Sequence, residues 1–423
     1  SADLSVEPYP ASAVRESDLV AFYLPMHTAT HLSVPLIERS KEMNPNAHIC
    51  AYGLYAPMNE FYLRQLGCRT VLGGEFEEGL LNLCRRLRMN AAADGPEEQI
   101  EPLISTSKQN FYTPERSGLP ELSNYARLCN GSSLSKITGY TEASHGCKHL
   151  CRHCPVVPVY NGRFRVVQRE VVLADIRQQV EAGAQHITFG DPDFFNGPGH
   201  AIPIVQALHK DFPEITYDVT IKIEHLLRYR KLLPVLRDTG CAIITSAVES
   251  IDDTVLAIFD KGHTRADFIK VVKIFNELGL VLNPTFIPFT PWTTMVGYRE
   301  LLMLIHELGL VEHVSPIQLA IRLLIPRGSK LLELAEVRTV IGDYNPQKLS
   351  YEWCNADPAV EELYHRVISI VRNSNTANLP RRDIFKKIWN ELSLLTGQSV
   401  PLPESTSGSH RACIPYLNEP WYC

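Results

Sequence analysis

The chain has 423 residues, of which 45% are hydrophobic and 21% charged, so it is an ordinary globular protein with more residues than one hydrophobic core normally serves. Its formal net charge of −6 argues against a broad basic face, and therefore against nucleic acid as a partner. It holds no apolar run long enough to span a membrane, and 11 cysteines in a chain of this length suit the reducing cytoplasm, where we expect the protein, better than a disulfide framework.

The first 92 residues alternate between strand-like apolar runs and helical patterns. Strands are predicted at residues 18–24, 49–52 and 70–75, and helices around 36–40, 59–66 and 77–88. This alternation is typical of a small parallel α/β unit, so we expect a Rossmann-like domain over residues 1–92. Residues 93–135 begin with a polar stretch rich in proline, glycine and glutamate, and they are predicted to form a linker.

The alternation resumes at residue 137 and lasts longer. Six strands are predicted, at residues 137–143, 186–190, 217–222, 242–248, 281–287 and 316–321. Helical patterns fill the gaps between them, at residues 170–182, 201–210, 225–236, 266–278 and 298–307. Six βα units in series predict a fold of the α/β class, a partial (β/α)6 barrel over residues 136–331. Residues 332–423 are predicted to form a helical extension with a cysteine-containing tail.

Three cysteines follow the first predicted barrel strand: Cys147, Cys151 and Cys154, in the spacing C-x₃-C-x₂-C. Thiolates hold iron–sulfur clusters, and three of them leave one iron of a [4Fe–4S] cluster open for a small molecule. Loops after barrel strands build the active sites of such folds. Half of a zinc site, buried apolar cysteines and a non-catalytic iron–sulfur carrier or sensor are the alternatives, although carriers usually saturate their cluster with four ligands.

Such a loop after the first strand of a six-unit barrel resembles the radical S-adenosylmethionine (SAM) superfamily. The resemblance covers residues 137–331. It implies a [4Fe–4S] cluster whose open iron binds the amino and carboxylate groups of SAM, and reductive cleavage of a carbon–sulfur bond of SAM. It further implies an enzyme that acts on a small molecule, a transferase rather than a lyase or an oxidoreductase, with a reductant such as flavodoxin or ferredoxin as partner.

The resemblance also assigns SAM contacts to two strand ends. Gly190, Asp191 and Asp193 match the glycine-rich acidic motif that accepts the SAM ammonium, a donor that carboxylates suit. Ser246 and Glu249 match the motif near the SAM ribose and methionine. For both motifs, a plain turn or helix cap is the alternative.

Three more residues are candidates for the same cavity. Gln318 and Arg322, around the sixth strand, are expected to face it. Either Arg322 or Lys261 is expected to pair with the SAM carboxylate. A surface charge explains each of these two cations equally well.

The N-terminal unit resembles the cobalamin-binding domain that precedes many radical SAM barrels. The matching pieces are residues 44–48 before one strand and residues 73–77 after another. Only about three strands precede the linker, fewer than the usual five, and the sequence holds no Asp-x-His-x-x-Gly motif for a cobalamin ligand. We therefore expect a truncated remnant without cobalamin, and a cobalamin-dependent radical SAM methyltransferase is the alternative.

A narrower resemblance rests on residues 146–165, 190–200 and 418–423. These resemble radical SAM proteins and selenoproteins named for a CUAEP or CCAEP tail, in which U is selenocysteine, although this chain stops at its cysteine. Cys413 and Cys423 are therefore candidate catalytic thiols that bind a soft element or act as a redox relay, and inert thiols are the alternative. The chain also resembles, in outline, the radical SAM enzymes of arsinothricin biosynthesis, which implies transfer of the 3-amino-3-carboxypropyl group of SAM to a thiol or to a metalloid such as arsenite.

Overall fold

The structure is a computed structural model that describes residues 1–89, 99–131, 135–397 and 414–418. It divides the chain into two compact units, each assembled from separate stretches of sequence. The first unit comprises Ser1–Asn110, Gly146–Arg165 and Leu324–Glu352, and the second comprises Phe111–His145, Val166–Leu323 and Trp353–Cys423. The domain boundaries expected after residues 92, 135 and 331 stay predictions. The three cysteines belong to the first unit.

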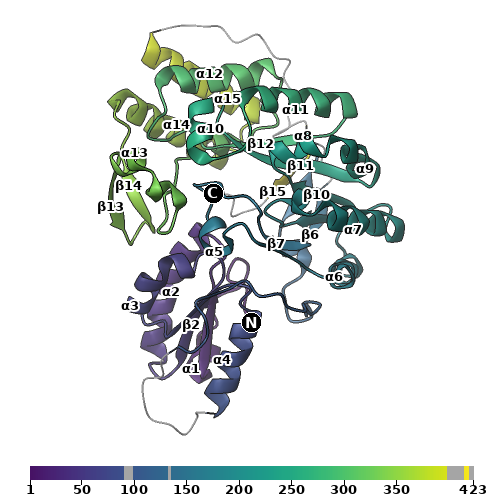
Figure 1. Cartoon of the computed structure of the whole chain (residues 1–423), viewed down its shortest axis with the longest axis vertical. Helices are drawn as coiled ribbons and strands as arrows, with labels where there is room; N and C mark the ends of the chain where they lie inside the picture. The colour runs from purple at the N-terminus through teal and green to yellow at the C-terminus, as the bar shows by residue number, and fades with distance from the viewer. Residues whose placement is uncertain (90–98, 132–134, 398–413, 419–423) are drawn as a thin grey trace. The chain divides into compact units, whose positions relative to one another are not determined.

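The first unit contains a parallel sheet in the order β1-β2-β3-β4, of which β2 is labelled in Figure 1. Its strands are β1 (Leu19–Tyr23), β2 (His48–Tyr52), β3 (Thr70–Gly74) and β4 (Ile104–Ser105). Its helices are α1 (Ala11–Glu16), α2 (His27–Met43), the 3₁₀ helix η1 (Pro57–Asn59), α3 (Glu60–Gln65) and α4 (Glu77–Met89). Ile49, Cys50 and Ala51 are all buried, because β2 is a central parallel strand covered on both faces. The three predicted strands are present, and β4 adds a fourth inside the predicted linker.

Two further pieces complete the first unit. Residues Gly146–Arg165, which we call the cysteine loop, run from the last residue of one short strand into a second short strand that pairs with it. These strands and the helix between them are β7 (Ser144–Gly146), α5 (Val157–Tyr160) and β8 (Phe164–Val166), and residues 144, 145 and 166 belong to the second unit. The other piece contains η6 (Lys330–Glu333), α13 (Ala335–Arg338) and a hairpin of β13 (Ile341–Asn345) and β14 (Ser350–Trp353).

The second unit is built on a seven-stranded sheet in the order β12-β11-β10-β9-β6-β5-β15 (Figure 1). Its strands are β5 (Arg127–Cys129), β6 (Ser135–Thr141), β9 (His186–Phe189), β10 (Thr216–Thr220), β11 (Cys241–Glu249), β12 (Leu282–Phe286) and β15 (Tyr416–Asn418). From β6 to β12 all neighbours are parallel, with Thr138 opposite His186 and Ile244 opposite Leu282. β5 and β15 extend the other edge in antiparallel pairing. The result is the partial α/β barrel that the sequence predicts.

The prediction of a sixth strand at residues 316–321 is wrong. Pro316–Leu319 forms the 3₁₀ helix η5 instead, and only Arg322 makes a parallel bridge, to Phe289. Proline has no N–H to give to a β-ladder. The chain therefore turns helically at Pro316 and meets the sheet only after this turn.

Helices alternate with the barrel strands and share one core with them. Their bounds are η2 (Leu122–Asn124), α6 (Arg169–Glu181), η3 (Phe194–Asn196), α7 (Pro198–Asp211), α8 (Ile223–Arg228), η4 (Arg230–Leu232), α9 (Leu233–Asp238), α10 (Asp253–Phe259), α11 (Arg265–Leu278), α12 (Met295–Glu307), α14 (Pro358–Thr376) and α15 (Arg381–Thr396). Tyr217 and Phe286 from strands and Phe268 from α11 are fully buried in this core. Leu363 of α14 and Ile388 of α15 belong to it as well, so the C-terminal helices pack as part of the barrel unit.

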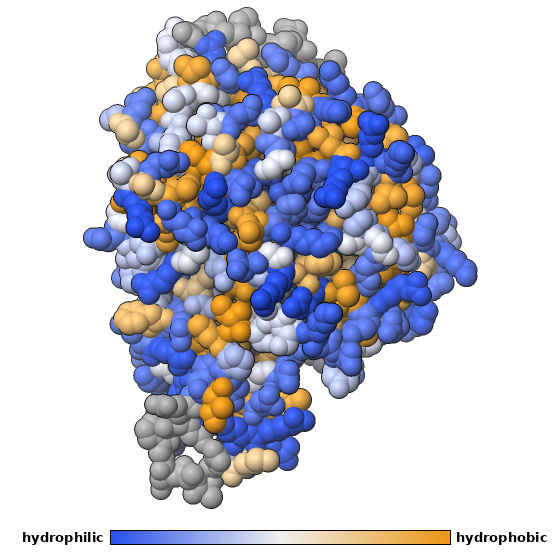
Figure 2. Space-filling view, in the orientation of Figure 1, coloured by the Kyte–Doolittle hydropathy of each residue, from blue (hydrophilic) through white to orange (hydrophobic). Residues whose placement is uncertain are grey.

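The surface carries scattered hydrophobic residues. On the face drawn in Figure 2, hydrophilic residues predominate and hydrophobic ones lie in small groups among them. Such scattering is normal for folded proteins. No helix in the described part of the chain is both long and apolar enough to cross a membrane.

Candidate active site

The cysteine loop carries all three predicted ligands, none of them in a disulfide. Cys151 is buried, whereas Cys147 and Cys154 are half-buried. Cys147 and Cys154 pack against the same small hydrophobic group, which is built around α5. The N–H of Cys154 donates to the carbonyl of Cys151 at 3.1 Å, and the N–H of Cys147 donates to the carbonyl of Arg163 at 3.1 Å. The fold thus gathers the thiols into one ordered loop.

The chemistry of this donor set fits a [4Fe–4S] cluster with three protein ligands. The soft thiolates that such clusters require are supplied three times between Cys147 and Cys154.

Gly146 sets the entry into the loop, directly before the first cysteine. Its φ is +73°, a left-handed conformation that favours glycine. A Cβ at this position would also overlap the ring of Tyr160 and the carbonyl of Arg163. Both conditions require glycine, so the loop starts with a turn that packs tightly on α5.

The middle of the loop is held by the segment around η6. The carbonyl of Arg152, between the second and third cysteines, accepts hydrogen bonds from Ser329 Oγ at 2.9 Å and from the N–H of Leu331 at 3.2 Å. Lys330 Nζ donates to Asn161 Oδ1 at 3.0 Å. These contacts fix the backbone from which the thiols project.

In the second unit, Gly190 and Asp191 follow β9 beside the end of β6. A Cβ on Gly190 would overlap the Tyr140 hydroxyl, so this close approach needs glycine. The Asp191 carboxylate accepts hydrogen bonds from the N–H of Ala143 at 2.8 Å and from Ser144 Oγ at 2.5 Å. Burial raises the pKa of Asp191 to about 7, against the lowering effect of these two hydrogen bonds. Asp191 thereby orders the turn after β6.

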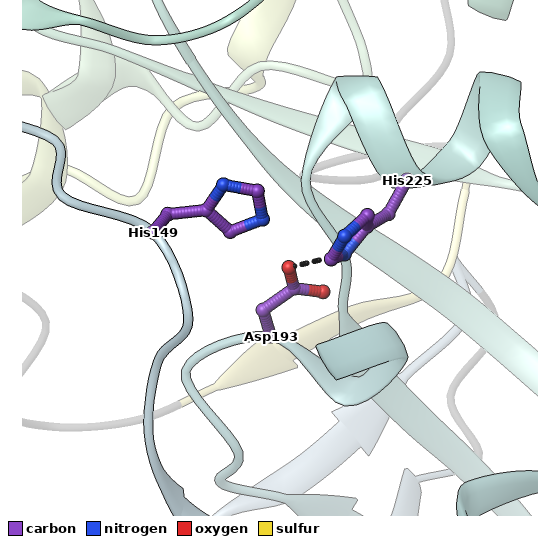
Figure 3. A group of neighbouring side chains, drawn as sticks. All are labelled: His149, Asp193 and His225. Atoms are coloured by element: carbon purple, nitrogen blue, oxygen red, sulfur yellow. Dashed lines mark ion pairs between the residues drawn. The ribbon is translucent and has the colours of Figure 1, made fainter. Parts of the chain in front are cut away.

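Asp193 is also bound by its own unit. One oxygen, Oδ2, pairs with His225 Nδ1 at 2.6 Å, as Figure 3 shows, and Oδ1 accepts from the N–H of Phe195 at 3.1 Å. The sequence analysis missed His225. Its position in the first turn of the helix after β10 could have marked it as a candidate site residue. Both acidic side chains of the predicted ammonium site are thus engaged by donors of the chain itself.

Glu249 and Lys261 are brought together. Glu249 ends β11 with φ of +67°, where the register with β12 shifts. Non-glycine residues rarely adopt this conformation, and they cluster at functional sites. The Glu249 carboxylate lies 3.5 Å from Lys261 Nζ, and both residues are buried. Ser246 has no exposed surface, and its hydroxyl has no hydrogen-bond partner among the described residues.

Three residues that sequence reasoning missed lie beside this pair. Lys222, two residues after β10, pairs with Glu224 at 3.4 Å. His263 is buried, and neither ring nitrogen has a hydrogen-bond partner in the described part of the chain. Burial, together with the nearby Lys261 and Lys222 ammoniums, lowers the pKa of His263 to about 4. For Lys222, its place just beyond a barrel strand was the signal that sequence offered.

The side chains of Arg322 and Gln318 bind neighbouring groups of the chain. The Arg322 guanidinium pairs with Glu361 at 2.9 Å, donates to the carbonyl of Trp353 at 2.6 Å and stacks 3.7 Å above the Trp353 ring. Gln318 Oε1 accepts from the N–H of Phe286 at 3.1 Å. Gln318 also lines a small cavity of about 80 Å³. Arg322 is therefore a paired cation rather than a surface charge.

A cleft of about 290 Å³ opens beside Glu249. It lies between the ends of β11 and β12 and the starts of α10 and α12, and its lining includes Ser250, Asp252, Pro288, Thr290, Trp292 and Tyr298. Aromatic walls with a few polar groups are typical of small-molecule sites. The lining of the cleft therefore combines aromatic, hydroxyl and carboxylate side chains.

The candidate thiols of the tail, Cys413 and Cys423, lie outside the described residues. Between them, Tyr416–Asn418 is described as β15. This strand pairs with β5, with Tyr416 opposite Cys129.

Comparison with known proteins bears directly on this site. The family model of the radical SAM superfamily matches residues 141–302 of this chain, and these residues include the three cysteines. The hopanoid C-3 methylase of Methylococcus capsulatus (strain Bath) is 24% identical over 151 residues, which are 36% of this chain and 29% of that protein. The chain therefore spans less than a third of the length of this curated relative.

Two solved structures resemble the chain over most of its length. The cobalamin-dependent SAM radical enzyme OxsB, with aqua-cobalamin bound, has a TM-score of 0.64 and 15% identity over 91% of this chain and 64% of that one. The radical SAM methyltransferase TsrM from Kitasatospora setae, with tryptophan substrate and a SAM analogue bound, has a TM-score of 0.60 and 15% identity. The match covers 80% of this chain and 73% of TsrM. At such identities the likeness shows the fold and not the reaction.

Proposed function

We propose that Cys147, Cys151 and Cys154 of this chain, which contains a radical SAM superfamily domain, hold a [4Fe–4S] cluster. With this cluster the enzyme would functionalise a small molecule. The observation that carries the proposal is the ordered loop that brings three cysteines together inside the matched region. When bound and reduced, the cluster supplies the electron that cleaves a carbon–sulfur bond of SAM.

The residues of the second unit support SAM binding in complementary ways. Lys261 offers an ammonium to a carboxylate, and Glu249 offers a carboxylate to an ammonium or a ribose hydroxyl. The cleft beside Glu249 offers Trp292 for contact with an adenine. Because both charged side chains are buried, they act where water is largely excluded, and their interactions with a ligand are strengthened.

A transferase is the reaction class that we propose. The relative named as a methylase and the neighbour named as a methyltransferase support it. Transfer of an aminocarboxypropyl group to a thiol or to arsenite, and membership in the CUAEP or CCAEP group, rest on sequence resemblance alone, and the candidate thiols Cys413 and Cys423 lie outside the described residues. The described residues add no support to these two finer assignments.

The central experiment is anaerobic reconstitution of the full chain with iron and sulfide, followed by turnover of SAM with dithionite as reductant. We expect the visible charge-transfer absorbance of an iron–sulfur cluster. We also expect SAM cleavage products, detected by mass spectrometry. Parallel reactions contain arsenite, a low-molecular-weight thiol or no acceptor. A non-catalytic carrier predicts a cluster without any SAM cleavage, and zinc in place of iron would exclude the cluster itself.

Replacing one ligand tests the assignment of the thiols. Cys151→Ser is expected to lose most of the bound iron and at least about a hundredfold of SAM cleavage, because a cluster with two thiolates is poorly held. Cys354→Ser is the matched control, since Cys354 is an exposed free thiol elsewhere in the chain. Iron analysis and product quantification check both variants. Equal iron in the two variants would refute the assignment.

A further inference from the structure

We infer that the first unit holds the cysteine loop at the carboxyl edge of its own sheet, where a domain of this kind would otherwise bind cobalamin. In this arrangement Tyr160 and Glu75 are positioning residues for the cluster. The part concerning the cluster rests on the proposed function. The argument uses contacts within the first unit alone.

The carboxyl edge of a parallel sheet is where doubly wound folds bind their ligands. In the first unit, this edge consists of the residues that follow β1, β2, β3 and β4. A cofactor at this edge needs backbone and side-chain surface that is open to it. The contacts made by these residues therefore decide whether cobalamin fits.

Glu75, directly after β3, faces the cysteine loop. It is only 2% exposed, and its Oε1 accepts a hydrogen bond from the Tyr160 hydroxyl on α5 at 3.0 Å. Its Oε2 accepts from Gln109 Nε2 at 3.3 Å. A buried carboxylate needs such donors, so Tyr160 and Glu75 stabilise each other's position.

The strands on either side of β3 contact the same loop. Leu54, which follows β2, packs against the hydrophobic group that includes Tyr160, Cys147 and Cys154. Thr106, which follows β4, accepts from Arg163 Nη1 through its hydroxyl at 2.8 Å. The carbonyl of Thr106 accepts from Arg165 Nε at 2.7 Å. Three successive strand ends thus bind one loop.

The remaining edge is covered by the hairpin. His27, at the start of the helix after β1, contacts the carbonyl of Lys348 through Nε2 at 2.8 Å. Asn59, in η1 after β2, accepts a hydrogen bond from the Tyr344 hydroxyl at 3.0 Å. Every strand end of this sheet is therefore in contact with protein.

Residues 73–77, one of the pieces that resemble a cobalamin-binding domain, begin with two glycines that contact other parts of the chain closely. A Cβ on Gly73 would overlap the ring of Pro57, and a Cβ on Gly74 would overlap the carbonyl of Ser105. The close approach that glycine allows is thus taken by Pro57 and by β4. The described residues do not fit cobalamin, although OxsB, which resembles this chain in fold, binds it.

The first test compares two variants that each lose one hydroxyl within the first unit. Tyr160→Phe removes the donor to Glu75, and Tyr344→Phe removes the donor to Asn59 as the matched control. Amide hydrogen exchange of the protein without its cluster is the readout. We expect exchange in residues 146–165 to become about fivefold faster in Tyr160→Phe and to stay unchanged in Tyr344→Phe. Equal exchange in both variants would overturn the inference.

The second test addresses the cluster. In reconstituted protein, removal of iron by a chelator is expected to be about tenfold faster in Tyr160→Phe than in Tyr344→Phe, and the electron paramagnetic resonance signal of the reduced cluster is expected to shift in the first variant only. The double variant Glu75→Gln/Tyr160→Phe is expected to lose iron no faster than Tyr160→Phe, because one contact is removed only once. Additive effects would contradict a direct role of this pair.

The third test addresses cobalamin. The purified full chain is dialysed against hydroxocobalamin, and we expect no stoichiometric retention of cobalamin; binding of one equivalent would overturn this part. Failure of the wild type to cleave SAM would defeat the proposed function, while the exchange and dialysis results would still decide this inference.

Discussion

At the scale of single residues, His263 makes stability depend on pH. Burial and the nearby Lys261 and Lys222 lower its pKa to about 4, whereas the ordinary value is 6.5; the nearby Glu249 carboxylate opposes this effect. Between these two values the unfolded chain binds a proton that the folded chain does not, so the free energy of unfolding rises with pH across this window. The contribution is complete above pH 6.5 and is lost as the pH falls towards 4.

Replacing His263 by a neutral residue should remove this dependence. For His263→Gln, we expect a free energy of unfolding that falls less than that of the wild type between pH 6.5 and pH 4, by about 3 kcal/mol over the whole window. Urea titrations at several pH values measure the difference. His31→Gln, at an exposed position, is the control; a slope for His263→Gln that parallels the wild type would contradict the prediction.

At the scale of elements, the turn between β7 and the cysteine loop depends on Gly146. Gly146→Ala is expected to lower the free energy of unfolding by about 2 kcal/mol, since alanine is strained at positive φ and its Cβ overlaps Tyr160. It should also reduce bound iron, because Cys147 is displaced. Gly118→Ala, where a Cβ would meet nothing within 4 Å, is the control. Calorimetry and iron analysis check both variants, and unaltered iron in Gly146→Ala would count against the proposed role of this turn.

Element patterns also show what the sequence reveals and what it hides. Apolar runs predicted the three strands β1 to β3 and the five strands from β6 to β12, because local period and burial coincide there. The sixth strand failed at Pro316, and β15 was missed since its pairing with β5 joins residues far apart in the chain. The cysteine spacing predicts three cluster ligands in one loop, and their role as ligands stays a prediction. The pairs Asp193–His225 and Tyr160–Glu75 depend on tertiary packing, which no local pattern contains.

At the scale of the whole molecule, α14 and α15 share the core of the barrel sheet. Ile388 of α15 is fully buried in that core, whereas Leu394 of the same helix is 75% exposed. We expect Ile388→Ala to cost about 3 kcal/mol of unfolding free energy and to increase hydrogen exchange in β11 and β12, because a cavity opens in the shared core. Leu394→Ala should stay within about 0.5 kcal/mol of the wild type. Destabilisation of α15 without any change in the barrel strands would contradict a single core.

The first unit is composed of three stretches of chain, and the last of them ends at Glu352. During synthesis, the cysteine loop therefore leaves the ribosome long before Ser329 and Leu331, which hold its backbone, have been added. Until then these supporting contacts of the loop cannot form. Under the proposed function, iron and sulfide are therefore expected to be loaded only after translation has passed residue 352, into the finished chain rather than the nascent one.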